Sequence, residues 1–168
     1  MKKESNYIME TVFVNIAEFA VVNNPAVIET RSLGSCVAIA LYDISTRACG
    51  LAHIMLPDSK KVNVGGKPGK YADVAIESML KKMLTMGVSR GNIVAKIAGG
   101  ACMFSGLSGS DFMNIGLRNV SAIKTVLKDL RINLIAEDTG GSYGRTIEFH
   151  TETGKLIVKS TMAPTKEI

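Results

Sequence analysis

A cysteine, a histidine and a threonine in the first third of the chain have the side chains that nucleophilic catalysis requires. Cys36 follows a glycine-containing turn, Ser32-Leu33-Gly34-Ser35, and opens an apolar run, while His53 lies inside a second apolar run. A thiol becomes a nucleophile near neutral pH when an adjacent imidazole takes its proton, and a third polar group must then orient the imidazole. Thr30, just before the turn, offers a hydroxyl or a carbonyl for this purpose. The three residues are therefore candidates for a cysteine-based catalytic centre.

The turn before Cys36 also suits the binding of a developing oxyanion. Backbone N–H groups near Ser35 and Cys36 could face a substrate oxygen, and Gly34 leaves room beside that substrate. From the residues alone, a structural alternative stays open. A cysteine at a strand start is commonly a small buried apolar residue, and a lone histidine in an apolar run commonly has a structural role. Spacing along the chain does not show whether the two side chains meet.

The remaining cysteines and histidine carry no comparable pattern. We expect Cys49 and Cys102 to pack as apolar side chains, and His150, at the end of a strand, to be exposed. The odd cysteine count and the lack of CxxC spacing argue against a disulfide framework and a zinc site. Gly99-Gly100 has neither the G-x-G-x-x-G spacing nor the Lys-Ser/Thr ending of nucleotide-binding loops. We therefore expect neither a metal nor another cofactor.

Composition places the chain among ordinary globular proteins. Its 168 residues are 46% hydrophobic and 21% charged, which suits one domain over residues 1–168. Neither a signal-peptide pattern nor a segment long enough to span a membrane is present, so we expect a soluble, cytoplasmic protein without membrane insertion. The net charge of +5 favours an acidic partner, but the basic residues are scattered and aromatic residues are few. We therefore expect no nucleic-acid partner.

Apolar patterning predicts an α+β domain in which sheet layers are flanked by helices. Strands are expected over 12–16, 27–30, 36–42, 50–56, 93–97 and 132–136, with a hairpin over 145–149 and 155–159. The strands 36–42 and 50–56 are apolar at almost every position, which predicts burial on both faces. Helices are expected over 72–84, ending at Gly87, and from an Asn114 N-cap through Leu130.

Six short blocks follow one another over nearly the whole chain. They are T-R-S-L-G-S-C at 30–36, A-H-I-M-L-P-D at 52–58, K-P-G-K-Y-A-D at 67–73, K-I-A-G-G-A-C-M-F at 96–104, N-I-G-L-R-N at 114–119 and E-D-T-G-G at 137–141. In these blocks the chain resembles the CheD family of chemoreceptor glutamine deamidases. The resemblance implies a Cys-His-Thr triad, whose roles of nucleophile, base and orienting residue fall on Cys36, His53 and Thr30. It also implies a helix-flanked β-sandwich, related to the fold of a deamidating bacterial toxin.

The same resemblance implies a reaction and two partners. Thiolate attack through a thioester would convert receptor glutamines to glutamate, on cytoplasmic receptor helices and without a cofactor. A CheC-type chemotaxis phosphatase, which can occupy the deamidase cleft in that family, is the second implied partner. We expect the loops 65–70 and 104–112 to contact it, with Lys67, Phe104 and Phe112 as contact residues.

Two other functions stay open at this point. The chain could be a non-enzymatic regulator that acts only by docking on the phosphatase. It could instead sense oxidants through Cys36, although the sequence offers no obvious resolving thiol. The presence of all three triad residues favours the enzyme.

Overall fold

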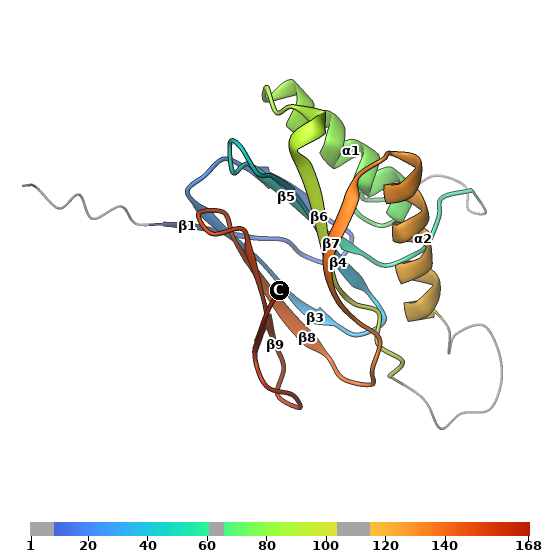
Figure 1. The fold of residues 1–168 in the computed structure, drawn as a ribbon. Coiled ribbons are helices and arrows are strands. Elements are labelled where there is room, and N and C mark those ends of the chain that lie inside the picture. The colour runs from blue at the N-terminus through green and yellow to red at the C-terminus, as the bar shows by residue number, and fades with distance from the viewer. Residues whose placement is uncertain (1–8, 61–65, 104–114) are drawn as a thin grey trace, which may run out of the picture.

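The computed structural model describes residues 9–60, 66–103 and 115–168, which form two five-stranded sheets and two α-helices (Figure 1). The first sheet has the strand order β1-β3-β8-β9-β10, with β1 parallel to β3 and the other neighbours antiparallel. Its strands are β1 (Glu10–Phe13), β3 (Ala26–Leu33), β8 (Arg145–His150), β9 (Lys155–Lys159) and β10 (Lys166–Glu167).

The second sheet has the order β2-β5-β4-β6-β7, with β6 parallel to β7 and the other neighbours antiparallel. Its strands are β2 (Phe19–Val22), β5 (Cys49–Ile54), β4 (Val37–Asp43), β6 (Ile93–Gly99) and β7 (Asn133–Thr139). The helices are α1 (Ala72–Thr85) and α2 (Ile115–Asp129), with a short 3-10 helix, η1 (Arg90–Asn92), before β6. Both α-helices cover the outer face of the second sheet, which confirms an α+β fold of sheet layers with flanking helices (Figure 1).

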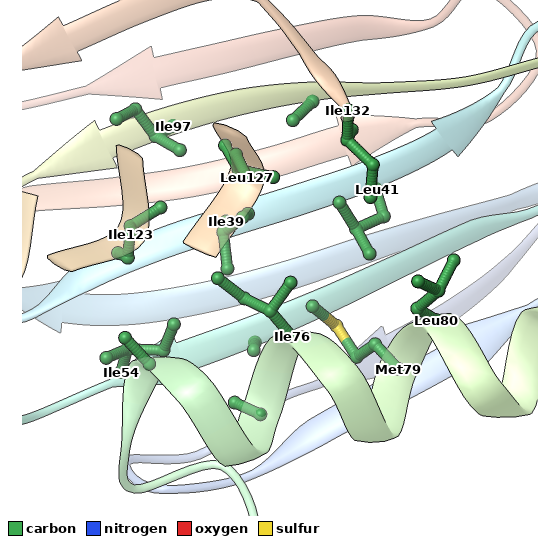
Figure 2. Packing of buried hydrophobic residues seen from close by; sticks show 14 of the residues in the cluster. Ile39, Leu41, Ile54, Ile76, Met79, Leu80, Ile97, Ile123, Leu127 and Ile132 are labelled. Atoms are coloured by element: carbon green, nitrogen blue, oxygen red, sulfur yellow. The ribbon is translucent and has the colours of Figure 1, made fainter. Parts of the chain in front are cut away.

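The strands β4 and β5 separate two apolar layers, and every residue of both strands is buried. Successive side chains of a strand point to opposite faces. Ile39 therefore packs beneath the helices with Ile76 and Ile123 (Figure 2), whereas Ala38 faces the first sheet and packs in the same layer as Phe149. The predicted burial on both faces is confirmed. The strand β5 carries His53 and Cys36 directly precedes β4, so this buried pair of strands positions both residues.

Some elements differ from the predicted ones at their ends. The strand expected over 12–16 ends at Phe13, although the Val14 amide still donates to the Glu29 carbonyl at 2.8 Å. The strands β2 and β10 were not predicted, because they contain only four and two residues and carry no clear alternation. Asn114, the predicted N-cap, lies outside the described residues. Within the described ranges, neither helix is long and apolar enough to cross a membrane.

Candidate active site

The turn that carries Cys36 is fixed by backbone hydrogen bonds to the segment that follows β6. The Gly34 carbonyl accepts from the Ala101 amide at 2.8 Å, and the Cys36 carbonyl accepts from the Gly100 amide at 2.8 Å. Cys36 is partly buried and packs against the apolar layer between the two sheets. The thiol therefore sits at the end of this layer, where β3 has passed into β4, and not in the middle of the core.

His53 lies on the same face of the second sheet as Cys36. In the antiparallel pairing of β4 with β5, Ala38 is directly opposite His53. Opposite residues point to the same face of a sheet, and so do residues two apart along one strand. Cys36 is therefore a diagonal neighbour of His53, which ordinary sheet geometry places about 7 Å away between Cβ atoms. The imidazole itself is fully buried.

Thr30 reaches His53 from the first sheet and determines which imidazole nitrogen carries the proton. The Thr30 Oγ1 atom lies 2.7 Å from the Val14 carbonyl oxygen and 2.7 Å from His53 Nδ1. A carbonyl can only accept, so the hydroxyl donates its single proton to Val14 and must accept from Nδ1–H. This leaves a lone pair on His53 Nε2, which has no hydrogen-bond partner among the described residues. The imidazole is thus held in the tautomer that can act as a base.

Burial keeps the two candidate reacting groups neutral at rest. It raises the pKa of the Cys36 thiol and lowers the pKa of His53 to about 4. The orienting partner Thr30 is an uncharged hydroxyl and does not offset the desolvation of an imidazolium as a carboxylate would. At neutral pH the pair therefore rests as thiol and imidazole, and a proton moves only when the thiol attacks. This arrangement suits general-base activation.

The buried imidazole predicts a loss of stability in mild acid. Between about pH 6.5, where histidine titrates in an unfolded chain, and about pH 4, the unfolded chain binds a proton that the folded chain excludes. The contribution of neutral His53 to the free energy of unfolding should therefore be fully present above pH 6.5 and decrease as the pH is lowered through this range. At pH 5 the decrease assigned to His53 is about 2 kcal/mol. Urea unfolding at pH 7 and pH 5 measures it, and His53→Asn should show a pH-dependent loss smaller by that amount. Equal losses in the two proteins would contradict a neutral buried His53.

The predicted oxyanion donors are available in the structure. The N–H groups of Ser35 and Cys36 form no hydrogen bond within the described residues, and both residues are only partly buried. Gly34 leaves limited space on one side, since an added Cβ would lie 3.2 Å from Met103 Cγ. The turn therefore presents two amide donors that are unpaired among the described residues, and their role toward an oxyanion stays a prediction.

Asn119, on α2, is a residue of this region that the sequence analysis did not single out. Its side chain is fully buried, and its Nδ2 donates to the Ser35 carbonyl at 3.0 Å and to the Met55 carbonyl at 2.9 Å. It thus joins the residue before Cys36 to a residue two positions after His53. The available signal was a polar residue on the apolar face of a predicted helix, next to Val120 and Ile123.

Of the three residues predicted to contact a partner, the structure describes only Lys67. Phe104 and Phe112 lie outside the described residues. Lys67 is exposed, and its ammonium pairs with the Glu18 carboxylate at 2.5 Å. The Glu18 carbonyl in turn accepts from the backbone amide of His53 at 3.0 Å. Lys67 is therefore linked to the candidate site through one intervening residue.

The other residues considered for chemistry have structural surroundings. Cys49 is fully buried in the layer between the sheets, which confirms the predicted packing role. Cys102 is partly buried, and its amide donates to the Gly141 carbonyl at 2.8 Å. His150 is half-buried beside the Glu148 carboxylate at 3.5 Å, and so is less exposed than predicted.

Comparison with known proteins shows which sequences this chain is similar to. Residues 55–160 match the family model described as "CheD chemotactic sensory transduction". The chain is 50% identical over 147 residues to "Probable chemoreceptor glutamine deamidase CheD" of Caldanaerobacter subterraneus, covering 88% of this chain and 91% of that one. It is 49% identical over 149 residues to "Chemoreceptor glutamine deamidase CheD" of Thermotoga maritima, covering 87% and 89%. The protein of the same name from Halalkalibacterium halodurans is 47% identical over 163 residues, covering 95% and 99%.

The extent of these matches matters for the candidate site. The family model begins at residue 55, after Thr30, Cys36 and His53. The match to the Halalkalibacterium protein covers 95% of the chain, so fewer than ten residues lie outside it and all three candidates lie within it. The similarity therefore extends over the segment that carries the Cys-His-Thr arrangement.

Proposed function

The chain belongs to the CheD family, and from that premise we propose that it hydrolyses glutamine side-chain amides of chemoreceptors to glutamate. Cys36 is the nucleophile, His53 its base, and Thr30 the residue that orients the base. The observation that carries this proposal is the 2.7 Å hydrogen bond between His53 Nδ1 and Thr30 Oγ1. It leaves the Nε2 lone pair unpaired within the described residues, on the face of the sheet that also carries Cys36.

The reaction follows from these positions. His53 Nε2 takes the thiol proton as Cys36 Sγ forms a bond to the carboxamide carbon, and the carbonyl oxygen becomes an oxyanion beside the Ser35 and Cys36 amides, which have no acceptor among the described residues. The protonated imidazole returns the proton to the amide nitrogen as the C–N bond breaks, and ammonia leaves. The resulting thioester is hydrolysed by a water that gives a proton to His53. Glutamate and the free thiol are the products.

A groove beside Thr30 supports a helical protein as the substrate. Residues 13–16 and 29–32 line it, and its volume is about 270 Å³. Two apolar side chains on its rim are exposed, Phe13 by 56% and Ile16 by 46%, and the Arg31 guanidinium lies 5.3 Å from the centre of the Phe13 ring. Apolar anchors beside the Arg31–Glu29 ion pair suit an amphipathic receptor helix with polar residues along one face.

The test is to incubate the protein with a chemoreceptor cytoplasmic fragment and follow its intact mass and the ammonia released. Each deamidation should add about 1 Da and release one ammonia, because a carboxamide becomes a carboxyl group. Peptide mapping then identifies the converted glutamines. A folded protein that converts no receptor glutamine would count against the proposal and in favour of a docking role alone.

The proposal includes a cytoplasmic location beside the receptor helices and docking of a CheC-type phosphatase on the loop that contains Lys67. Gly69, in this loop, packs so tightly that an added Cβ would lie 2.4 Å from the Glu18 carbonyl. Because Ala17 and Glu18 both bond to the backbone of His53, a partner on this loop would lie close to the base.

Lys67→Glu is expected to weaken phosphatase binding by about tenfold, since it places a negative charge beside Glu18 and in the contact loop. Calorimetric titration of the phosphatase measures the change. Lys155→Glu, which alters an exposed lysine on β9, is the matched control and should bind as the wild type does. Equal affinities of the two variants for the phosphatase would show that Lys67 does not contribute to the interface.

A further inference from the structure

We infer that Asn119 is a positioning residue that aims the Cys36 backbone N–H at the substrate oxyanion. This inference rests on the proposed deamidase function and adds a specific element to it. Among the described residues, Asn119 makes no hydrogen bond to the thiol or to the imidazole. It acts through the peptide that joins Ser35 to Cys36.

Asn119 reaches this peptide from the side of the helices. Its neighbours Val120 and Ile123 pack in the apolar layer between the helices and the second sheet. The Ser35 carbonyl, which accepts from Asn119 Nδ2 at 3.0 Å, therefore points toward the helices. The Cys36 side chain points the other way, into the layer between the sheets.

The geometry of the Ser35–Cys36 peptide then sets the direction of its N–H. The only cis peptide among the described residues is Asn24-Pro25, so the Ser35–Cys36 peptide is trans. In a trans peptide the C=O and N–H bonds point in opposite directions within one plane. Fixing the Ser35 carbonyl toward Asn119, which also binds Met55 at the end of β5, therefore fixes the Cys36 N–H in the opposite direction, away from β5. This direction leaves the oxyanion donor and the base on opposite sides of the reacting carbon. An oxyanion donor must be aimed before the reaction, because reorientation during the reaction would cost catalytic free energy.

The same Asn119 amide also binds the segment that follows the strand of the base. Asn119 Nδ2 donates to the Met55 carbonyl at 2.9 Å, and Met55 directly follows the end of β5, which carries His53. One buried nitrogen thus anchors the Ser35 carbonyl to the backbone at the end of β5, while the pairing of β5 with β4 keeps His53 in place independently. An amide with two protons on one nitrogen can make this bridge, whereas a hydroxyl has a single proton.

The contact between Asn119 and the nucleophile turn requires a close helix approach and leaves one buried acceptor unsatisfied. An added Cβ on Gly116 would lie 2.5 Å from the Gly100 carbonyl oxygen, so α2 packs closer to the segment after β6 than a larger residue at position 116 would allow. Asn119 Oδ1 is buried without a hydrogen-bond partner among the described residues. An unsatisfied buried acceptor destabilises a fold. Packing alone would be served better by leucine, which indicates that the amide serves the turn and not the core.

The experiment uses Asn119→Leu, which keeps the branched shape and the number of side-chain heavy atoms, removes both donated hydrogen bonds and removes the unsatisfied acceptor. Three readouts are compared with the wild type: receptor deamidation, alkylation of Cys36 by iodoacetamide, and reversible binding of butanal. Butanal copies the end of a glutamine side chain. Its carbonyl carbon bonds to Sγ while the thiol proton moves to its oxygen, so the adduct places an oxygen where the oxyanion forms. Protection of Cys36 against iodoacetamide measures its affinity.

We expect kcat for deamidation to fall about 10- to 100-fold with KM within about threefold, because the donor remains but loses its fixed direction. The affinity for butanal should fall about tenfold for the same reason. Alkylation by iodoacetamide, which develops no oxyanion, should stay within about threefold. Ile123→Ala, a core truncation on the same helix, is the matched control and should change none of these readouts by more than about threefold in the folded protein.

Two results would overturn the inference. Alkylation that falls as much as turnover would show that Asn119 merely holds Cys36 against His53. Unchanged turnover and unchanged butanal affinity would show that the amide direction is fixed by other contacts. If the wild type converts no receptor glutamine, the proposed function fails, while the butanal and alkylation results still decide the role of Asn119. Asn119→Ala provides the same comparison if the leucine variant does not fold.

Discussion

Replacing Cys36 with alanine should lower kcat for receptor deamidation by about 10⁴-fold or more, because the thioester route has no other nucleophile. The fold should survive, since Cys36 is only partly buried at a turn whose backbone is held by the Gly34 and Cys36 carbonyls. Intact-mass analysis of the receptor fragment gives the rate, and circular dichroism checks the fold. Quenching the wild-type reaction in acid should trap a thioester on Cys36 that hydroxylamine cleaves.

Cys49→Ala is the matched control for this prediction. Cys49 is fully buried between the sheets, and burial raises the pKa of its thiol well above the ordinary value. Its removal should cost about 1 kcal/mol of stability through the lost packing and leave the deamidation rate within about threefold. Full activity of Cys36→Ala would contradict the mechanism. Normal phosphatase binding by both proteins, with no deamidation by the wild type, would favour the docking regulator.

The electrostatics of Cys36 also bear on the oxidant-sensor alternative. Redox-sensing thiols react as thiolates and have a low pKa in an electropositive, exposed site. Burial instead raises the pKa of Cys36. The neutral imidazole of His53 provides no positive charge that would lower it at rest. These surroundings favour a thiol that is activated only when a substrate is in place.

The sequence was sufficient to predict the types of residue in the site but not how they meet. The buried runs of β4 and β5 and the turn before Cys36 could be identified from local patterning, since apolar residues at nearly every position indicate burial on both faces. The register that sets Ala38 opposite His53 depends on pairing between strands, which no local pattern encodes. Thr30 was found near Cys36 in the chain, yet it acts on His53 from the other sheet.

Two contributions to the site come from groups that sequence patterns do not identify. The Val14 carbonyl determines which way the Thr30 hydroxyl donates, and any residue type could supply that carbonyl. Asn119 lies 83 positions after Cys36 in the numbering and meets its turn only because Gly100 and Gly116 allow α2 to approach. Both contacts depend on packing between distant segments. Sequence analysis can indicate a buried polar residue on a helix but not the carbonyl that it binds.

His53→Asn separates the base from the hydrogen bond that orients it. The asparagine amide can still donate to Thr30 Oγ1, so the packing between the sheets should persist, but the variant has no atom in place of Nε2. We expect kcat to fall about 10³-fold or more, with the alkylation rate of Cys36 at pH 7 falling as well. Without the base, alkylation should rise about tenfold per pH unit toward the raised pKa of the thiol. The wild type should depend less steeply on pH above about 5, since burial lowers the pKa of His53 to about 4 and the base is already deprotonated.

His150→Asn is the control for this comparison, because His150 lies at the end of β8 with Glu148 as its partner and should not affect turnover. Thr30→Val should give a smaller loss than His53→Asn, about 10- to 100-fold, since the imidazole remains but its tautomer is no longer held by the Val14–Thr30 chain. The order of the three rates is the decisive result. A His53→Asn protein that deamidates and alkylates at wild-type rates would require a different base, and the hydrogen bond to Thr30 would then be a structural contact between the two sheets.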